Sequence, residues 1–334
     1  MESDKKFVKL AITIPAYNEE KNIGRVIREI PKRIEGIDEI EIIVINDGSN
    51  DRTSEAAKEA GANRIISHSN NKGVGRAFST GLNAAIETGA DIIVNIDADR
   101  QFNPEDIPKL IEPILKNEAE FVTASRFLDK DLEPEIPYIK KIGNQLFTWV
   151  ISEITGQYFT DTQCGFRAFS RKAALKLNLF GKFTYTQEVF LDLVNKDITI
   201  KEIPIWVSYD KNRKSRVVKN PLLYGIKALS IIIRTVRDTK PLFFFGNFGL
   251  FFLLTGFLIG AWLILRWWIT GYVSPYTSMV NLSALLLIVG FILCVLALIA
   301  DMLSRNRKIQ EEVLYFNKMQ LYKNGLEKNR EKNI

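Results

Sequence analysis

At 334 residues and roughly 150 residues per domain, the chain is long enough for about two structural units. Its 45 Lys and Arg outnumber its 39 Asp and Glu only mildly, which does not indicate a nucleic-acid partner. The single histidine, His68, excludes histidine-cluster metal sites, and two cysteines, Cys164 and Cys294, are too few for a disulfide framework.

Short apolar runs alternate with amphipathic segments over the first 130 residues. The runs are continuously apolar and rich in β-branched residues, as in parallel strands buried on both faces. They predict strands at 9–15, 41–47, 62–68, 91–97 and 120–126, and the segments between them predict helices at 19–34, 51–60, 74–88 and 104–117. This order predicts an α/β fold with a doubly wound, mostly parallel sheet, in which ligands bind at the carboxyl ends of the strands.

Residues 241–300 contain one charged side chain, Arg266. Two uncharged stretches, 241–265 and 280–300, are each long enough to cross a hydrocarbon core of roughly 30 Å as a helix. We predict two transmembrane helices; two buried core helices of a soluble protein are the alternative. Basic residues flank the pair on both outer sides and the loop between is uncharged, so both termini are predicted on the cytoplasmic face of the cell membrane.

Polar and aromatic residues follow three predicted strands, in IPAYNEE (14–20), INDGSNDRT (45–53) and IDADRQ (96–101). Asp97 and Asp99, with Gln101 as a further oxygen donor, suit Mg²⁺ or Mn²⁺, which bridge carboxylates and substrate phosphates. Asp-rich surface turns are the alternative for this triplet. IPAYNEE also fits a helix start capped by Asn18, but an aromatic ring and carboxylates at one sheet edge suit a nucleoside.

The motifs IPAYNEE, VINDGSNDRT, NKGVGRAF, DADRQF, ASRF and DTQCGFRAF, in this order, resemble glycosyltransferase family 2 with the GT-A fold. Within it they resemble the dolichyl-phosphate mannose synthase and polyprenyl-phosphate glycosyltransferase branch, over about residues 8–216. The resemblance implies inverting, metal-dependent transfer of one sugar, of mannose, glucose or N-acetylglucosamine type, for glycan or glycoprotein assembly. The donor would be a GDP- or UDP-sugar, and the acceptor dolichyl phosphate or another polyprenyl phosphate.

The resemblance also assigns roles to residues. The nucleotide sugar would be bound by Pro15, Tyr17, Glu19, Ile45, Asp47, Asp97, Ala98, Asp99, Gln101 and Arg213. The cation, Mg²⁺ or Mn²⁺, would be held by Asp99 and Gln101. The acceptor phosphate would be bound by Arg126, Arg167, Ser215 and Arg216, and the catalytic residues would be Asp99, Arg126 and Arg167. Guanidinium groups suit a phosphate that is already anionic at neutral pH and needs no general base.

One departure and several alternatives stay open. The family's VDDGS reads INDGS here, so the amide of Asn46 replaces a carboxylate, and the preference for uracil or guanine is undecided. A hydroxyl-bearing lipid acceptor would need Asp161 as a base. A polysaccharide synthase would require a QxxRW motif, and a catalytically dead nucleotide-binding scaffold is a further alternative. Cys164 is predicted to be a packed residue, and His68 to have no catalytic part.

These patterns divide the chain into four parts. A cytoplasmic GT-A catalytic domain is predicted at 1–218, a juxtamembrane amphipathic helix at 219–240, a transmembrane hairpin at 241–303 and a basic cytoplasmic tail at 304–334. The 219–240 segment favours an interfacial helix on an anionic bilayer, with a linker helix as the alternative. The tail is predicted to be a solvated helical extension. A further amphipathic helix is predicted at 138–156.

Overall fold

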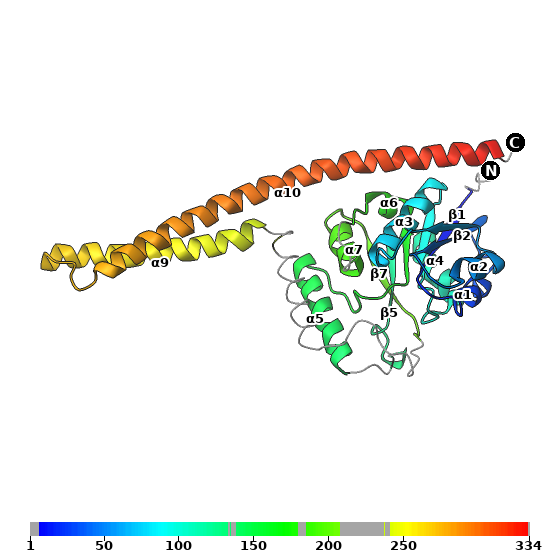
Figure 1. Cartoon of the computed structure of the whole chain (residues 1–334), viewed down its shortest axis with the longest axis horizontal. Coiled ribbons are helices and arrows are strands. Elements are labelled where there is room, and N and C mark those ends of the chain that lie inside the picture. The colour runs from blue at the N-terminus through cyan, green and yellow to red at the C-terminus, as the bar shows by residue number, and fades with distance from the viewer. Residues whose placement is uncertain are drawn as a thin grey trace. The chain divides into compact units, whose positions relative to one another are not determined.

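The computed structural model describes residues 7–132, 134, 138–179, 185–207, 237 and 241–332. It contains a seven-stranded sheet of order β3-β2-β1-β4-β6-β5-β7 (Figure 1). The strands are β1 Lys9–Ala16, β2 Glu39–Asn46, β3 Arg64–Ser67, β4 Ile92–Asn95, β5 Phe121–Ser125, β6 Arg167–Ser170 and β7 Ile200–Pro204. Only β6 runs antiparallel to its neighbours, β4 and β5. The predicted α/β, doubly wound and mostly parallel sheet is confirmed.

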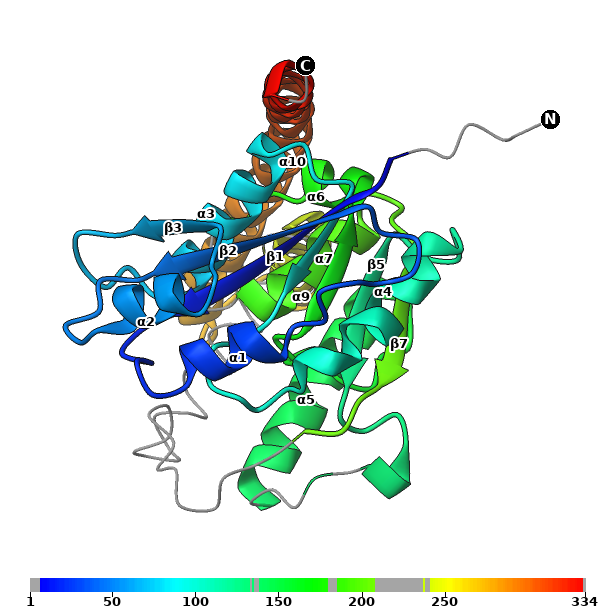
Figure 2. The ribbon, with the colours of Figure 1, turned by 90° about the vertical axis from the view of Figure 1, so that its right-hand side faces the viewer.

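Helices cover both faces of the sheet (Figure 2). On one face, α1 (Ile23–Glu29) and α4 (Ile107–Leu115) share a core with Leu10, Ile12 and Ile14 of β1. On the other, α3 (Val74–Glu87), α6 (Arg171–Lys176) and α7 (Tyr185–Val194) share a core with Ala11 of β1. Successive side chains of a strand alternate between faces, and here both faces are dry, which explains the continuously apolar runs.

The described residues of this part also contain two further α-helices and two short 3₁₀ helices, η1 (Pro104–Asp106) and η2 (Lys130–Leu132). The short helix α2 (Thr53–Glu59) follows β2, and α5 (Tyr138–Thr155) follows β5. The helix predicted at 138–156 is therefore confirmed. Its apolar residues divide between two environments: Phe147 and Val150 are buried, whereas Leu146 and Trp149 are exposed.

The register of the strands determines where the functional loops begin. Pro15 of β1 pairs with Ile45 of β2, and Thr13 of β1 pairs with Asn95 of β4, so β1, β2 and β4 end at one edge. The antiparallel strand β6 starts at that same edge, because Arg167 pairs with Asn95 on one side and Thr123 on the other. The strand order reverses between β1 and β4, which is where open α/β sheets bind ligands.

Two C-terminal helices, α9 (Pro241–Thr270) and α10 (Thr277–Lys332), are long and apolar enough to cross a membrane. Only 17% of the most apolar window of each is buried, unlike core helices of a soluble protein. Small residues let the two backbones approach closely: a Cβ on Gly290 would lie 2.7 Å from Leu253 N. Ser283 Oγ also donates to the Gly256 carbonyl at 2.7 Å. Apart from Arg237, the helix predicted at 219–240 lies outside the described residues.

The end of α10 differs from the predicted solvated tail. The chain forms two compact units, and residues 313–334 belong with 1–217 rather than with 218–312. Tyr322 is only 4% exposed and lies in the core cluster of α3 and α6. Its hydroxyl accepts a hydrogen bond from Arg171 Nη1, and the Arg171 guanidinium lies 4.9 Å from the centre of its ring. Lys318 donates to Asn178 Oδ1 at 3.0 Å. One face of this highly charged helical segment therefore packs on the first compact unit through the Tyr322 ring and the hydrogen bond of Lys318.

We expect Tyr322→Ala to release this docked segment, because the substitution removes a buried ring and the hydrogen bond to Arg171. The thermal midpoint in detergent should fall by about 5 °C, and trypsin should cleave the segment at 313–332 first. Phe316→Ala is the control, since Phe316 is 60% exposed on the same helix. Equal behaviour of the two variants would show that the segment is not docked.

Candidate active site

Loops at the carboxyl ends of β1 and β2 are joined to each other by hydrogen bonds. Asn18 N–H donates to Ser49 Oγ at 2.9 Å, and Asn50 N–H donates to Asn18 Oδ1 at 2.9 Å. Asn46 Oδ1 accepts Ser49 N–H at 2.8 Å, and its Nδ2 donates to Ser54 Oγ at 2.7 Å. Asn46 therefore uses its amide oxygen within its own turn and its amide nitrogen to bind Ser54 in the first turn of α2, so the amide that replaces the family's carboxylate stabilises this loop.

The predicted nucleotide residues of these two strands differ in exposure. Pro15 and Ile45 are register partners, and the Ile45 side chain is fully buried in the core beneath α3. Tyr17 is half-buried at the edge. Glu19 is 9% exposed, and its carboxylate accepts Asn22 Nδ2–H at 2.6 Å. Of these four, Tyr17 is the most exposed side chain at the edge.

Asp47 is 3% exposed, and both of its oxygens accept hydrogen bonds within the protein. Oδ1 lies 2.7 Å from His68 Nδ1 and accepts Lys72 N–H at 2.9 Å; Oδ2 accepts Gly73 N–H at 2.8 Å. His68 Nε2 lies 3.1 Å from Thr80 Oγ1 on α3. No pattern in the sequence indicated this cluster, because its members lie in the loop after β2, the loop after β3 and helix α3.

Asp97 and Asp99 leave the end of β4, with Ala98 buried between them. Asp99 Oδ1 accepts Gln101 N–H at 3.1 Å, so the expected metal ligands are adjacent. The Asp97 carboxylate lies against Gly165, where an added Cβ would come 2.5 Å from Asp97 Oδ2. Asn95 Nδ2 donates to the Gly165 carbonyl at 2.9 Å. The loop before β6 therefore packs directly against the Asp97 carboxylate through Gly165.

Asp97, Asp99 and Gln101 offer only oxygen donors, which fits Mg²⁺ or Mn²⁺ and not a thiolate- or imidazole-bound metal. Within the residues that the structure describes, no group of three or more His, Cys, Asp and Glu side chains is placed so that it could hold a metal ion. A cation here would take its remaining ligands from substrate phosphates and water, as magnesium commonly does. The donor set and its place at the strand ends fit the expected divalent ion.

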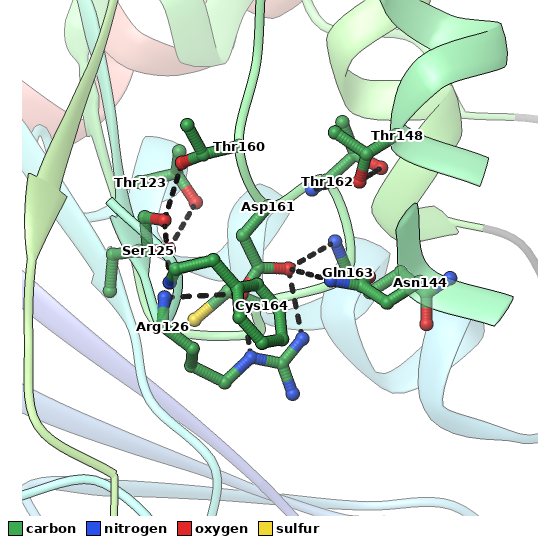
Figure 3. A network of polar contacts seen from close by, with 12 residues as sticks. Thr123, Ser125, Arg126, Asn144, Thr148, Thr160, Asp161, Thr162, Gln163 and Cys164 are labelled. Carbon is green, nitrogen blue, oxygen red and sulfur yellow. Dashed lines mark hydrogen bonds and ion pairs between the residues drawn. The ribbon is translucent and has the colours of Figure 1, made fainter. Parts of the chain in front are cut away.

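Arg126 follows β5 and is gripped by Asp161, which lies in the loop before β6 (Figure 3). Arg126 Nε donates to Asp161 Oδ2 at 2.6 Å, and Nη2 donates to Oδ1 at 2.9 Å. The same carboxylate accepts Arg126 N–H at 3.3 Å, Gln163 N–H at 3.0 Å and Asn144 Nδ2–H at 3.4 Å. The Asp161 side chain is fully buried, whereas that of Arg126 is 14% exposed. Asp161 therefore orients Arg126, and its carboxylate accepts hydrogen bonds from five donors in all.

Glu202 on β7 holds the loop that carries Asp161. Its Oε2 accepts Thr160 N–H at 2.8 Å, and its Oε1 accepts Asp161 N–H at 2.9 Å. Burial raises the pKa of Glu202 above its ordinary 4.5, opposed by these two N–H bonds and reinforced by the charge of Asp161. The sequence analysis did not identify Glu202, because it lies in no motif and no strand was predicted at the position of β7.

Arg167 occupies a different environment from Arg126. As the first residue of β6 it points to the same face as Phe169, and its guanidinium is fully buried 5.2 Å from the Phe190 ring centre. Nε donates to the Cys164 carbonyl at 2.7 Å and Nη2 to the Thr162 carbonyl at 3.1 Å. Arg167 thus fastens the loop 160–166 from beneath and does not reach the protein surface.

The placement of the other predicted residues follows from the sheet. Asp99 follows β4 and Arg126 follows β5, and these strands are separated by β6, so their ends lie about 10 Å apart at one edge. Arg213, Ser215 and Arg216 lie outside the described residues. Cys164 is buried, which raises its pKa to about 12, so the prediction of a packed thiol is confirmed.

Comparison with known proteins identifies the family. Residues 11–177 match the family described as Glycosyl transferase family 2. A UDP-N-acetylglucosamine–dolichyl-phosphate N-acetylglucosaminyltransferase of Methanococcus voltae is 36% identical over 225 residues, covering 61% of this chain and 88% of that protein. The chain belongs to glycosyl transferase family 2. The resemblance read from its motifs is thereby confirmed, and the protein is a glycosyltransferase.

Two further similarities extend this result. A dolichol-phosphate mannosyltransferase of Pyrococcus furiosus is 28% identical over 228 residues, covering 66% of the glycosyltransferase described here and 58% of that protein. Glucosyl-3-phosphoglycerate synthase of Mycobacterium tuberculosis, solved with Mn²⁺, uridine diphosphate and phosphoglyceric acid, has a TM-score of 0.52 at 23% identity. The matched region covers 69% of this chain and 78% of the synthase. At this identity the structural likeness supports the GT-A fold.

Gly165→Ala should disturb Asp97, because the new methyl group would overlap its carboxylate. Strain of about 1–3 kcal/mol corresponds to a loss of about 5- to 150-fold in kcat/KM for the sugar donor. Gly246→Ala is the matched control, since the nearest heavy atom to its added Cβ, Ala297 Cβ, is 4.0 Å away. Full activity of Gly165→Ala would contradict the close packing of this loop on Asp97.

The raised pKa of Glu202 predicts a pH dependence of stability. A carboxyl group with a higher pKa in the folded chain binds its proton preferentially there. The thermal midpoint of the wild type relative to Glu202→Gln should therefore fall as pH rises from 4.5 through the raised pKa, then level off. Glu118 is the control of opposite sign, because Lys201 lowers its pKa. A wild-type midpoint that rises with pH relative to Glu202→Gln would be inconsistent with this burial.

Proposed function

We propose that this glycosyltransferase moves a single sugar from a GDP- or UDP-sugar to the phosphate of dolichyl phosphate or another polyprenyl phosphate, with inversion at the anomeric carbon. The two named relatives support the acceptor class, because both act with a dolichyl or dolichol phosphate according to their names. The two apolar helices support a lipid acceptor, since they suit a protein that works at a membrane. The sugar is of mannose, glucose or N-acetylglucosamine type.

The observation that carries this proposal is the ion pair that Asp161 forms with Arg126. A hydroxyl acceptor needs a general base, and Asp161 was the candidate. That carboxylate is fully buried and accepts five hydrogen bonds, including two from the Arg126 side chain. A phosphate monoester needs no base, because its second pKa near 6 leaves it anionic at neutral pH. What it needs is an oriented cation, which Arg126 supplies.

The reaction then proceeds as an in-line displacement. An oxygen of the lipid phosphate forms a bond to the anomeric carbon while the bond to the nucleoside diphosphate breaks and its electron pair leaves with that group. Arg126 holds the acceptor phosphate in line, since a guanidinium can grip two phosphate oxygens at once. We assign Arg167 and Glu202 the role of holding the loop 160–166 in place. Arg167 donates to carbonyl groups of this loop, and Glu202 accepts from its N–H groups.

On the donor side, Asp97, Asp99 and Gln101 would hold the nucleotide sugar and its Mg²⁺ or Mn²⁺. A bound divalent ion supplies positive charge to the departing diphosphate. Tyr17 offers a ring face for the base, and Arg213 remains a candidate for binding the nucleotide sugar. Ser215 and Arg216 remain candidates for binding the acceptor phosphate. The basic flanks of the apolar helices favour a catalytic domain and both termini on the cytoplasmic face.

A donor and acceptor panel tests this function. Radiolabelled GDP- and UDP-sugars are incubated with dolichyl phosphate and Mn²⁺, and organic-extractable label is counted with and without a chelator. We expect one donor to give chelator-sensitive product that is lost when dolichol replaces dolichyl phosphate. Equal product from dolichol would favour a hydroxyl acceptor and overturn the proposal.

Two substitutions separate the donor and acceptor roles. Asp99→Ala should abolish transfer, because it removes an expected metal ligand. Arg126→Ala should lower kcat/KM for the lipid phosphate by about 10- to 100-fold while nucleotide binding stays within about twofold. Arg25→Ala is the control, since Arg25 is an exposed residue of α1 paired with Glu29. Unchanged turnover of Asp99→Ala would remove the metal assignment.

A further inference from the structure

The His68–Asp47 cluster lies at the nucleotide edge but is absent from the reaction just described. His68 directly follows β3, and its side chain is 7% exposed. A carboxylate can only accept hydrogen bonds, so the 2.7 Å contact with Asp47 Oδ1 requires the proton on His68 Nδ1. In the neutral ring, Nε2 is then an acceptor for the hydroxyl of Thr80, 3.1 Å away. The network thus assigns one tautomer to the only histidine of the chain.

The order carboxylate, imidazole, hydroxyl also occurs in nucleophilic triads, but Thr80 does not suit that chemistry. It lies in the middle of α3, a 14-residue helix, and not on a strained turn that would present its oxygen to a substrate. Its hydroxyl instead ties the imidazole ring to the helix. A positioning role for His68 therefore fits the geometry better than a nucleophilic one.

Asp47 connects His68 to the loop 70–73, which leads into α3. Its two oxygens accept Lys72 N–H and Gly73 N–H, the first groups before the helix. Gly73 has a φ of 90°, in the left-handed region. The same loop packs closely on Gly48, where an added Cβ would lie 2.5 Å from the Asn70 carbonyl carbon. The Asp47 carboxylate is thus one of the groups that hold this loop, together with Asn71 Oδ1, which accepts Gly73 N–H at 3.1 Å, and the packing on Gly48.

We infer that His68 is a positioning residue for nucleotide binding: by donating from Nδ1 to Asp47, it fixes the loop 70–73 beside the nucleotide. This inference rests on the proposed function, because it requires a nucleotide at the carboxyl ends of β1 to β3. It also revises the part expected of Asp47. With three donors on a 3% exposed carboxylate, Asp47 acts on the nucleotide chiefly through the loop that it holds.

Two substitutions of His68 discriminate this role from a merely structural one. The amide nitrogen of Asn overlays histidine Nδ1, whereas that of Gln overlays Nε2. His68→Asn should therefore keep the bond to Asp47 and keep UDP or GDP affinity within about threefold. His68→Gln should lose that bond and weaken nucleotide binding by about tenfold, as expected for one hydrogen bond to a charged group. Ser69→Ala, at the exposed neighbouring residue, is the control.

The measurements are the Kd of UDP and GDP with Mn²⁺, the separate KM values for sugar donor and dolichyl phosphate, and the thermal midpoint of each variant. We expect His68→Gln to raise the donor KM about tenfold and to leave the acceptor KM within about twofold. Nucleotide affinity of His68→Gln equal to that of the wild type would overturn the inference, and so would equal losses in His68→Asn and His68→Gln.

A spectroscopic test does not depend on activity. The chain has one histidine, so the untagged full-length protein labelled with ¹⁵N-histidine gives one pair of imidazole signals. We expect the neutral ring to carry its proton on Nδ1, and both signals to shift when UDP or GDP is added with Mn²⁺. A proton on Nε2 would overturn the inference alone. Failure of the wild type to bind either nucleotide would instead remove the proposed function and this inference with it.

Discussion

The buried ion pair between Arg126 and Asp161 is the contact on which the proposed acceptor side of the site depends. A fully buried carboxylate is costly unless it is paired and hydrogen-bonded, and Asp161 satisfies this through donors from three segments. Those donors come together only when β5, α5 and the loop before β6 are all in place. Glu202 adds a fourth element by gripping the N–H of Asp161 from β7. The orientation of one arginine is thus a property of the assembled domain.

The loop 160–166 serves both halves of the site. Its first part carries Asp161, and its last part packs Gly165 against Asp97 and accepts a hydrogen bond from Asn95. The antiparallel strand β6, into which the loop leads, separates β4 from β5. Without that strand the two functional loops would leave adjacent strands about 4.8 Å apart, too close for a sugar and a phosphate between them. The inserted strand therefore provides the spacing that a transfer reaction needs.

The sequence predicted the first five strands and the helices between them because buried parallel strands produce continuous apolar runs. It did not predict β7, nor β6, where a buried arginine stands at the first position and the pairing is antiparallel. The segment 97–101 after β4 and Arg126 after β5 were recognisable as local patterns, and their roles in metal and phosphate binding stay predictions. The partners of Asp47 were not, since His68 lies 21 residues away in the chain and Lys72 contributes only a backbone group. The docked face of α10 was hidden by its high charge, which indicates solvent exposure.

A sequence motif locates a carboxylate but does not show what it binds. The structure separates carboxylates that bind groups within the protein from those that lie partly exposed at the strand ends. Asp161 and Asp47 are buried and accept backbone N–H groups, so they act as internal anions that set loop positions. Asp97 and Asp99 are half-buried at the strand ends, where solvent and substrate have access. Asp161, the candidate base, is thus already paired with Arg126 and hydrogen-bonded to backbone N–H groups. That arrangement suits the proposed acceptor, which brings its own negative charge, and under the proposed function the arginine rather than a carboxylate is the decisive group for acceptor choice.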